Sequence, residues 1–276
     1  MKKIIYNFKS KLTKKITNPQ NILGGKGANL SEMGKLGFAV PPGFTISTEA
    51  CELFYNNKKK FNLRLKSQIK RELKIIEKET KKKFGDTKNP LLVSVRSGAR
   101  VSMPGMMDTI LNLGLNDQTV IGLANMTNNP RFAKDSYRRF IQMYSNVVLG
   151  IESHNFEDLI ENYKLTKGVL LDTDLNESDW DNLISDFKKL VKDKINKNFP
   201  QNVFEQLNGA IESVFLSWQS DRAKVYRKLN HIPPSWGTAV NVQSMVFGNM
   251  GKDCSTGVAF TRNPSTGEKL FFGEFL

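Results

Sequence analysis

An apolar segment that ends in two arginines constrains this chain more than any other feature. Leu91 to Val95 has the apolar character of a buried strand, and Arg96 and Arg100 follow it among small residues and glycines. A guanidinium group at the end of a buried strand is held in place and can donate two parallel hydrogen bonds to a phosphate or a carboxylate. The pattern therefore predicts an anion site, although an arginine that forms a salt bridge within the loop would give the same local pattern.

A glycine-rich segment near the start of the chain points to the same chemistry. Residues 24–34 read GGKGANLSEMG, and helix-forming residues follow Lys26. A glycine-rich turn that opens a helix presents free backbone N–H groups to an anion, and the lysine adds a positive charge. The segment is not a Walker A loop, because Gly27 stands where that motif needs serine or threonine. Such turns are common, so this one supports an anion site without establishing it.

Composition excludes several classes of protein. The 276 residues are 39% hydrophobic, no apolar run is long enough to span a membrane, and the N-terminus lacks the apolar stretch of a signal peptide. We therefore expect no membrane partner. Cys51 and Cys254 are isolated and form neither a disulfide framework nor a metal-ligand pattern, so we expect a cytoplasmic location.

The net charge of +14 does not indicate nucleic-acid binding. Residues 56–83 contain ten lysines and two arginines against three glutamates, so most of the excess charge lies in one segment. Apolar residues recur there at helical spacing, which predicts an amphipathic helix with a lysine-rich face toward water. Because the chain has no recognition motif and no basic segment interleaved with aromatic residues, we expect no nucleic-acid partner.

Hydrophobic periodicity divides the chain into zones. Residues 1–112 mix short strands with helices, whereas residues 113–202 are helical and largely lack strands. A further helix starts near residue 203, and residues 238–276 are rich in strands, with NPSTGE as a hairpin turn. The apolar stripes of three expected helices are Tyr137, Phe140, Ile141, Tyr144 and Val148; Trp180, Leu183, Ile184, Phe187 and Val191; and Phe204, Leu207, Ile211, Phe215 and Trp218.

Three segments together resemble the pyruvate, phosphate dikinase family. They are GGKGANLSEMGKLGFAVPPGFTIST, SVRSGARVSMPGMMDTILNLGLND and GTAVNVQSMVFGNMGKDCSTGVAFTRNPSTGE, and they occur in that family's order. The motifs GGKGANL and VRSGA are shared in looser form with phosphoenolpyruvate synthases, whereas SMPGMMDTILNLGL and VFGNMGKDCSTGVAFTRNP are more specific to the dikinase. The resemblance covers nearly the whole chain and is weaker in residues 55–90 and 150–205.

The resemblance implies an α+β, ATP-grasp-like fold that holds ATP between two subdomains. Residues 1–112 plus 203–238 would form the first subdomain, and residues 113–202 would form a helical insertion. Residues 239–276 would begin a second nucleotide-binding subdomain that is incomplete in this chain.

The same resemblance assigns roles to individual residues. Lys26 and Arg96 would face the triphosphate as catalytic cations, because phosphoryl transfer depends mainly on positioning and on charge neutralisation. Glu274 would bind Mg²⁺. The glycine loop 248–257 would fold over the phosphates, although a plain hairpin turn would give the same pattern. The remaining nucleotide contacts would come from Gln243, Met245, Val246, Gly248, Gly251 and Gly257.

By this resemblance the chain is the ATP-binding part of an enzyme that converts ATP, pyruvate and phosphate to AMP, phosphoenolpyruvate and diphosphate. His154 and His231 lack the context of the family's phosphohistidine. The phosphohistidine and pyruvate-binding domains would therefore lie on a missing or separate polypeptide, and we expect the chain alone to be inactive. Three alternatives stay open: a non-catalytic nucleotide-binding fragment, a decayed reading frame, and the kinase part of a phosphoenolpyruvate synthase-like enzyme. Whether the chain forms a homo-oligomer is also open.

Overall fold

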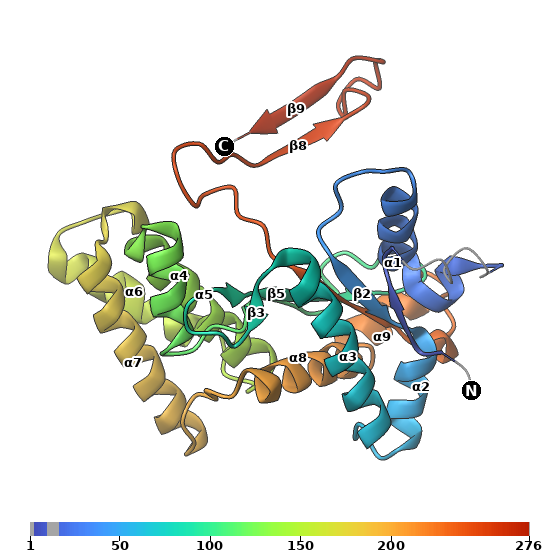
Figure 1. Ribbon diagram of the computed structural model, residues 1–276, viewed down its shortest axis with the longest axis horizontal. Coiled ribbons are helices and arrows are strands. Elements are labelled where there is room, and N and C mark those ends of the chain that lie inside the picture. Colours follow the sequence, from blue (N-terminus) through green and yellow to red (C-terminus); the bar gives the residue numbers. More distant parts are fainter. Residues whose placement is uncertain (1–2, 10–16, 276) are drawn as a thin grey trace.

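The computed structural model describes residues 3–9 and 17–275 and combines helices with an antiparallel sheet (Figure 1). The main sheet has five strands in the order β1-β2-β7-β5-β6, and every neighbouring pair is antiparallel. The mixed α+β class expected from the sequence is confirmed. The strands are β1 (Ile5–Asn7), β2 (Gly43–Ile46), β5 (Val93–Gly98), β6 (Thr109–Leu113) and β7 (Ala239–Ser244).

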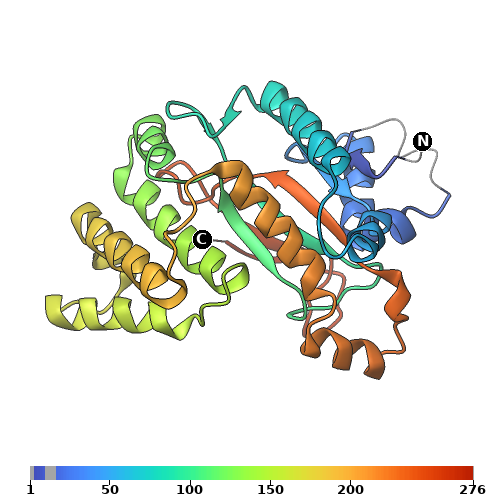
Figure 2. The same ribbon diagram turned by 90° about the horizontal axis from the view of Figure 1, so that it is seen from below.

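One face of the main sheet is apolar, because side chains alternate between faces along each strand. Phe44, Val242 and Val95 are register partners across β2, β7 and β5, and all three are fully buried. Helix α8 (Val203–Ser217) lies across the sheet (Figure 2), and its apolar stripe belongs to the same core cluster. The sheet and α8 therefore form the centre of the main hydrophobic core.

The opposite face of the same strands is polar. Arg96 on β5 is the register partner of Asn241 on β7, which in turn is the partner of Thr45 on β2. Helix α1 (Pro19–Lys35) packs against these three strands. Polar side chains at alternate positions of central strands are therefore enclosed between the sheet and α1.

The helices predicted from apolar spacing are confirmed. The lysine-rich segment forms α3 (Leu63–Thr80). The apolar stripes lie on α5 (Pro130–Val147), α7 (Glu177–Ile195) and α8. Asparagine side chains begin several helices: Asn62, Asn129 and Asn202 each accept a hydrogen bond from a backbone N–H of the first turn. The remaining α-helices are α2 (Thr48–Asn56), α4 (Thr119–Thr127), α6 (His154–Lys167) and α9 (Asp221–Leu229).

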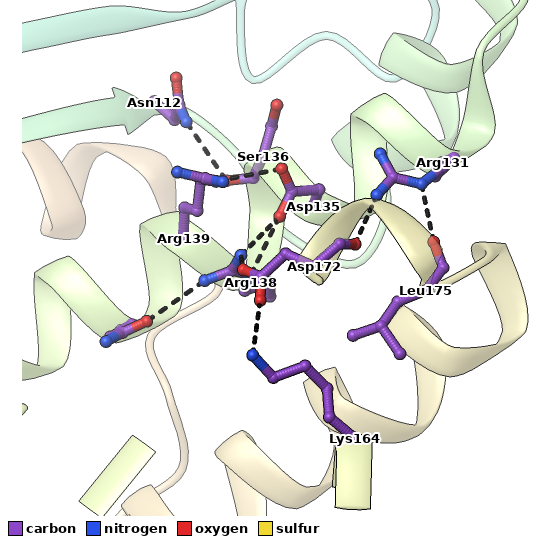
Figure 3. A network of polar contacts seen from close by, with 10 residues as sticks. Asn112, Arg131, Asp135, Ser136, Arg138, Arg139, Lys164, Asp172 and Leu175 are labelled. Carbon is purple, nitrogen blue, oxygen red and sulfur yellow. Dashed lines mark hydrogen bonds and ion pairs between the residues drawn. The ribbon is translucent and has the colours of Figure 1, made fainter. Parts of the chain in front are cut away.

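A polar network ties the helices between β6 and α8 together (Figure 3). The guanidinium of Arg138 on α5 lies 2.9 Å from Asp135 and 2.8 Å from Asp172, and it stacks 4.5 Å from the ring centroid of Trp180 on α7. Lys164 on α6 reaches the same Asp172 at 3.3 Å. Because the charges of Arg138 and Lys164 are paired with carboxylates, the network stabilises the helical part.

The last strands form a hairpin that stands away from the main sheet (Figure 1). β8 (Gly257–Phe260) pairs with β9 (Phe272–Phe275), and Asn263 closes the predicted NPSTGE turn by accepting a hydrogen bond from the Ser265 N–H at 2.8 Å. The predicted hairpin is confirmed. Two short strands, β3 (Lys83–Phe84) and β4 (Pro90–Leu91), form a separate parallel pair.

The structure divides the segment expected to begin a second subdomain. Residues 239–244 form β7, which lies inside the main sheet, whereas β8 and β9 lie outside it.

In the described part of the chain, no helix has the length and apolar character needed to cross a membrane.

Candidate functional site

The glycine-rich segment and the end of strand β5 are in direct contact. Helix α1 is kinked at Gly24, whose φ of 68° and ψ of 170° are not helical. The N–H of Gly25 donates to the carbonyl of Ala99 at 2.9 Å, and a Cβ on Gly24 would lie 1.7 Å from the carbonyl oxygen of Gly98. Only glycine therefore permits this approach. The turn expected to open a helix is a kink inside a helix that begins five residues earlier, at Pro19.

A buried pair of polar side chains on the sheet packs against the contact between α1 and β5. The hydroxyl of Thr45 donates to the side-chain oxygen of Asn241 at 2.7 Å, and both residues are almost fully buried. A Cβ on Gly27 would lie 2.6 Å from the Thr45 hydroxyl, and a Cβ on Gly98 would lie 2.6 Å from the Asn241 amide nitrogen. Glycines from both motifs therefore rest on one pair of side chains, which fixes the separation of the two motifs.

Lys26 lines a cleft beside this contact. The cleft has a volume of about 570 Å³, and Lys26 is the only charged residue among the described residues that line it. Partial burial of the ammonium group, and to a smaller extent repulsion by Arg96, lowers the pKa of Lys26 below its ordinary value of 10.5. The two predicted cations therefore lie close enough to repel each other. Other lining residues are Gly25, Asn29, Ser97, Ser102 and Thr109.

Arg96 is held without a counter-charge. It is half-buried, its Nη2 donates to the side-chain oxygen of Gln243, and its Nε is buried without a hydrogen-bond partner in the described structure. Burial lowers the pKa of Arg96. The guanidinium of Arg100 stacks 5.1 Å from the ring centroid of Trp236. Among the described residues, no carboxylate lies within 4.0 Å of either arginine, so the structure contains no loop salt bridge to explain them.

Two cations without a neutralising carboxylate in the described structure favour an anion. Bringing Lys26 and Arg96 together costs electrostatic free energy in the absence of a ligand, and an anion between them would reverse the sign of that interaction. A phosphate group matches this arrangement, because it can accept hydrogen bonds from a guanidinium and from an ammonium at the same time.

A second, apolar hollow lies on the other side of Gln243. It has a volume of about 480 Å³, and Met245 and Val246 contribute to its lining together with Pro41 and Leu92. The amide nitrogen of Gln243 donates to the carbonyl oxygen of Pro41 at 3.1 Å. Two of the residues predicted to contact adenine therefore border an apolar hollow, and Gln243 reaches from its rim to Arg96.

The glycine loop that follows this hollow rests against helix α5. The amide nitrogen of Asn129 donates to the carbonyl of Met250 at 3.2 Å, and the Phe247 ring packs edge-on against Phe132 with centroids 5.1 Å apart. A Cβ on Gly248 would lie 2.5 Å from the Thr256 Cβ, so the loop closes on itself. The three glycines predicted to approach the phosphates do not line the Lys26 cleft in the described structure. These glycines are Gly248, Gly251 and Gly257.

Glu274 is remote from both hollows in the described structure. It lies on strand β9, opposite Val258 on β8, and it is exposed. Glu274 does not line either the Lys26 cleft or the apolar hollow. Within residues 3–9 and 17–275, no group of three or more histidine, cysteine, aspartate or glutamate side chains could hold a metal ion. The described residues thus offer a single candidate carboxylate rather than a complete metal site.

Comparison with known protein families agrees with the geometry of the cleft. The sequence profile described as "Pyruvate phosphate dikinase, AMP/ATP-binding domain" matches residues 20–74 and 61–274. The chain belongs to this family. The match includes both motifs that meet at Gly24 and Gly98, as well as the β8–β9 hairpin.

Curated relatives are pyruvate, phosphate dikinases from bacteria and plants. The protein of Clostridium symbiosum is 57% identical over 258 residues, which is 93% of this chain and 30% of the relative. That of Rhizobium meliloti (strain 1021) is 51% identical over all 276 residues, or 31% of the relative. The chloroplastic protein of Flaveria pringlei is 50% identical over 275 residues, or 29% of the relative. The chain thus spans about a third of the length of these dikinases.

Sequence reasoning missed two parts of the candidate site. Thr45 and Asn241 were not expected beneath the dikinase glycine motifs, and the side chain of Gln243 was not expected to contact Arg96. The available signal was a polar residue at every second position of an otherwise apolar strand, where Asn241 and Gln243 alternate with valines. This alternation is equally typical of a strand with one face toward water, so it does not show that Asn241 and Gln243 are buried.

Proposed function

We propose that this chain forms the ATP-binding part of a pyruvate, phosphate dikinase. In this proposal a phosphoryl group passes from ATP to a histidine outside this chain, and the complete enzyme converts ATP, pyruvate and phosphate to AMP, phosphoenolpyruvate and diphosphate. Membership of the AMP/ATP-binding domain family supports a nucleotide as the ligand. The observation that carries the proposal is that Lys26 lines a cleft together with Thr109, the register partner of Arg96, and that the only side-chain acceptor for Arg96 in the described structure is the neutral Gln243.

The two cations would bind the phosphates of ATP. Backbone N–H groups that follow the kink at Gly24 would add donors beside Lys26, and Arg96 supplies a guanidinium whose orientation is set by a hydrogen bond. Charge that develops on the transferred phosphoryl group would be stabilised by these fixed donors, which is the main contribution a protein makes to phosphoryl transfer. Lys26 and Arg96 are therefore the proposed catalytic residues.

The base would occupy the apolar hollow beyond Gln243. Met245 and Val246 border this hollow and would meet the adenine ring, whereas the main chain at Gln243 is paired inside the sheet on both edges. An apolar hollow with a few polar groups at its rim is the usual form of a small-molecule site. A nucleotide that spans both hollows would pass Gln243, because this residue contacts Arg96 on one side and Pro41 on the other.

The glycine loop and Glu274 complete the proposal. We propose that Gly248, Gly251 and Gly257 let the loop approach the phosphates when ATP is bound, while the contacts with α5 anchor its start. Glu274 is the proposed carboxylate for Mg²⁺, an ion that proteins commonly bind through one or two carboxylates together with substrate phosphates. Because the described residues offer no further ligand group, we assign the metal no step in the chemistry.

The remaining parts of the proposal concern how the chain is divided into subdomains and which domains lie outside it. An ATP-grasp-like arrangement is proposed, with residues 1–112 plus 203–238 as the first subdomain, 113–202 as the helical insertion and 239–276 leading into the second subdomain. The pairing of β8 with β9 outside the main sheet supports a separate second unit that starts after β7. The phosphohistidine and pyruvate-binding domains would lie outside this chain, and the location would be cytoplasmic.

Nucleotide titration of charge variants tests the proposed phosphate site. Lys26→Ala or Arg96→Ala should weaken ATP binding by about tenfold to a hundredfold, the value of one charge-assisted contact. Adenosine binding should change little, because adenosine has no phosphates. Arg96→Lys should restore only part of the loss, since an ammonium cannot reproduce a two-pronged contact. Isothermal calorimetry with both ligands measures these differences.

Arg262→Ala is the matched control, because Arg262 is an exposed cation on the β8–β9 hairpin. This variant should bind ATP as the unmodified chain does. The proposed site is wrong if Lys26→Ala and Arg96→Ala weaken ATP and adenosine binding equally, or if the unmodified chain does not prefer ATP to adenosine.

A further inference from the structure

The side chain of Gln243 is engaged at both ends. Gln243 is 4% exposed. Its carbonyl oxygen accepts a hydrogen bond from Nη2 of Arg96, and its amide nitrogen donates to the Pro41 carbonyl at 3.1 Å. The two partners fix the orientation of the amide, because a guanidinium can only donate and a backbone carbonyl can only accept. Each polar atom of the amide therefore has one partner within the protein.

The position of Gln243 in the sheet explains why it can reach Arg96. Arg96 is the register partner of Asn241, and Gln243 stands two residues further along the same strand, on the same face. Such diagonal neighbours across an antiparallel pair lie within reach of long side chains. β7 is paired on both edges, with β2 and with β5, so the backbone that carries Gln243 is fixed.

A neutral acceptor suits an arginine that has to bind an anion. In the described structure Gln243 is the only side chain that accepts a hydrogen bond from Arg96. A carboxylate in its place would fix the guanidinium equally well, but it would also cancel its charge and compete with phosphate for the same donors. An amide orients the guanidinium and leaves its full positive charge available.

We propose that Gln243 is a positioning residue that acts through Arg96. By joining Arg96 to the Pro41 carbonyl, it holds the guanidinium in the direction of the phosphates and couples that direction to the rim of the apolar hollow. Phosphate binding gains because a group that is already oriented loses less conformational freedom when the ligand arrives. This proposal rests on the proposed function, since it assumes that the ligand of Arg96 is a nucleotide phosphate.

A double-mutant cycle tests the coupling. Gln243→Met keeps the length of the side chain and removes both hydrogen bonds. This change should weaken ATP binding by about threefold to tenfold, the effect of one lost hydrogen bond, and it should leave adenosine binding unchanged. In an Arg96→Ala background, Gln243→Met should have no further effect on ATP. A loss that is equal for both ligands, or that adds fully to the loss from Arg96→Ala, would show that Gln243 is only structural.

The control separates positioning from general destabilisation. Val242 is the neighbouring residue on β7, and it is fully buried on the apolar face. Val242→Ala should lower the melting temperature at least as much as Gln243→Met, because it removes buried apolar volume. The ratio of ATP to adenosine affinity should nevertheless stay at the level of the unmodified chain. A change in that ratio in Val242→Ala would remove the distinction and contradict the proposal.

A measurement without nucleotide tests the hold of Gln243 on Arg96 separately from the proposed function. In ¹⁵N-arginine spectra, the guanidinium of Arg96 should rotate slowly about its Nε–Cζ bond while Gln243 accepts from it, and it should rotate freely in Gln243→Met. Unchanged rotation would overturn the positioning role even if ATP binds as proposed. Loss of the slow signal together with equal binding of ATP and adenosine would support the hold on Arg96 and contradict only the proposed function.

Discussion

Strand β7 and the β8–β9 hairpin follow each other in the chain but lie in opposite environments. All six residues of β7 are buried, and the strand is paired with β2 on one edge and β5 on the other. All residues of the two hairpin strands are exposed, and within the described structure they pair only with each other. β7 and β8 both belong to one of the three segments that resemble the dikinases in sequence, so resemblance alone does not say which of them is already organised.

The difference teaches which part of the candidate site is organised in this chain. Lys26 and Arg96 are fixed through contacts that reach β7, because Asn241 supports the glycines of both motifs and Gln243 holds the arginine. Glu274 stands on a hairpin without a supporting layer. Precise function needs side chains held by packing and by hydrogen bonds. The proposed phosphate-binding half of the site is therefore organised, and the proposed metal-binding half is not.

Hydrogen exchange should show the largest difference between the two regions. Amides of β7 should exchange at least about 1,000-fold more slowly than amides of β8 and β9, because central strands open only with the core whereas isolated two-stranded hairpins are marginally stable in water. Exchange followed by mass spectrometry on peptides from 239–244 and 257–275 measures this ratio. Similar protection of the two regions would mean that the hairpin is covered in solution and that the comparison is wrong.

Glycine substitutions should separate the two regions by stability. Gly24→Ala places a methyl group 1.7 Å from the Gly98 carbonyl at a φ of 68°, so it should lower the free energy of unfolding by about 2–4 kcal/mol. Gly267→Ala, in the hairpin turn, has the same sign of φ with no atom within 4 Å. It should cost at most about 1 kcal/mol. Urea unfolding compares the two variants, and equal midpoints would argue against the contact between α1 and β5.

Exposed aromatic residues should make the hairpin the main source of self-association. Phe271, beside β9, is 78% exposed, and Phe38, on the body of the molecule, is 60% exposed. Phe271→Ser should weaken self-association by about tenfold, since burying one such ring is worth roughly 1.5–3 kcal/mol. Phe38→Ser should have a smaller effect. Sedimentation at several concentrations measures the association constants, and the hairpin is not the contact if both variants behave alike.

The smallest expected effect concerns the charge of Lys26. Its lowered pKa means that the folded state binds this proton less strongly than the unfolded state does. The charged form of Lys26 therefore lowers the free energy of unfolding. This penalty is present in full below the pKa of the folded state, and it disappears as the pH rises toward 10.5, the pKa of the unfolded state. At pH 7, Lys26→Met should raise the free energy of unfolding by less than about 1 kcal/mol, because much of the side chain is exposed to water. The same variant should weaken ATP binding.

Lys252→Met is the control for this prediction, since Lys252 lies in the exposed loop before β8. Its melting temperature should match that of the unmodified chain. The gain in Lys26→Met should shrink between pH 7 and pH 10. A gain that is independent of pH would show that methionine stabilises the cleft by packing rather than by removing a charge.

Local patterns predicted much of the fold and the organised part of the site. The helical stripes of α5, α7 and α8 were readable because 3.6-residue periodicity is a local property. Arg96 beside an apolar run was readable for a similar reason, since the two are adjacent in sequence. The prediction that the strand ends before Arg96 was wrong, because Arg96 lies inside β5 and pairs with Thr109 and Asn241. The prediction that Lys26 and Arg96 serve one site came from the family resemblance and not from spacing.

Long-range pairing was not readable from the sequence. Nothing local in residues 239–244 shows that they insert between β2 and β5, so the expected start of the second subdomain coincides with a strand of the main sheet. The bond between Gln243 and Arg96 joins residues 147 positions apart. The kink at Gly24 was interpreted as the start of a helix because a positive φ and a helix boundary both favour glycine.

The strand order has a consequence for synthesis on the ribosome. β7 is the last strand of the main sheet to be made, yet it occupies the centre of that sheet. A nascent chain that ends before residue 239 holds β1–β2 and β5–β6 as two separate strand pairs with no partner between them. Distant pairings of this kind close slowly. Lys26 and Arg96 are translated early, but the geometry that makes them a pair is a late event in the life of the polypeptide.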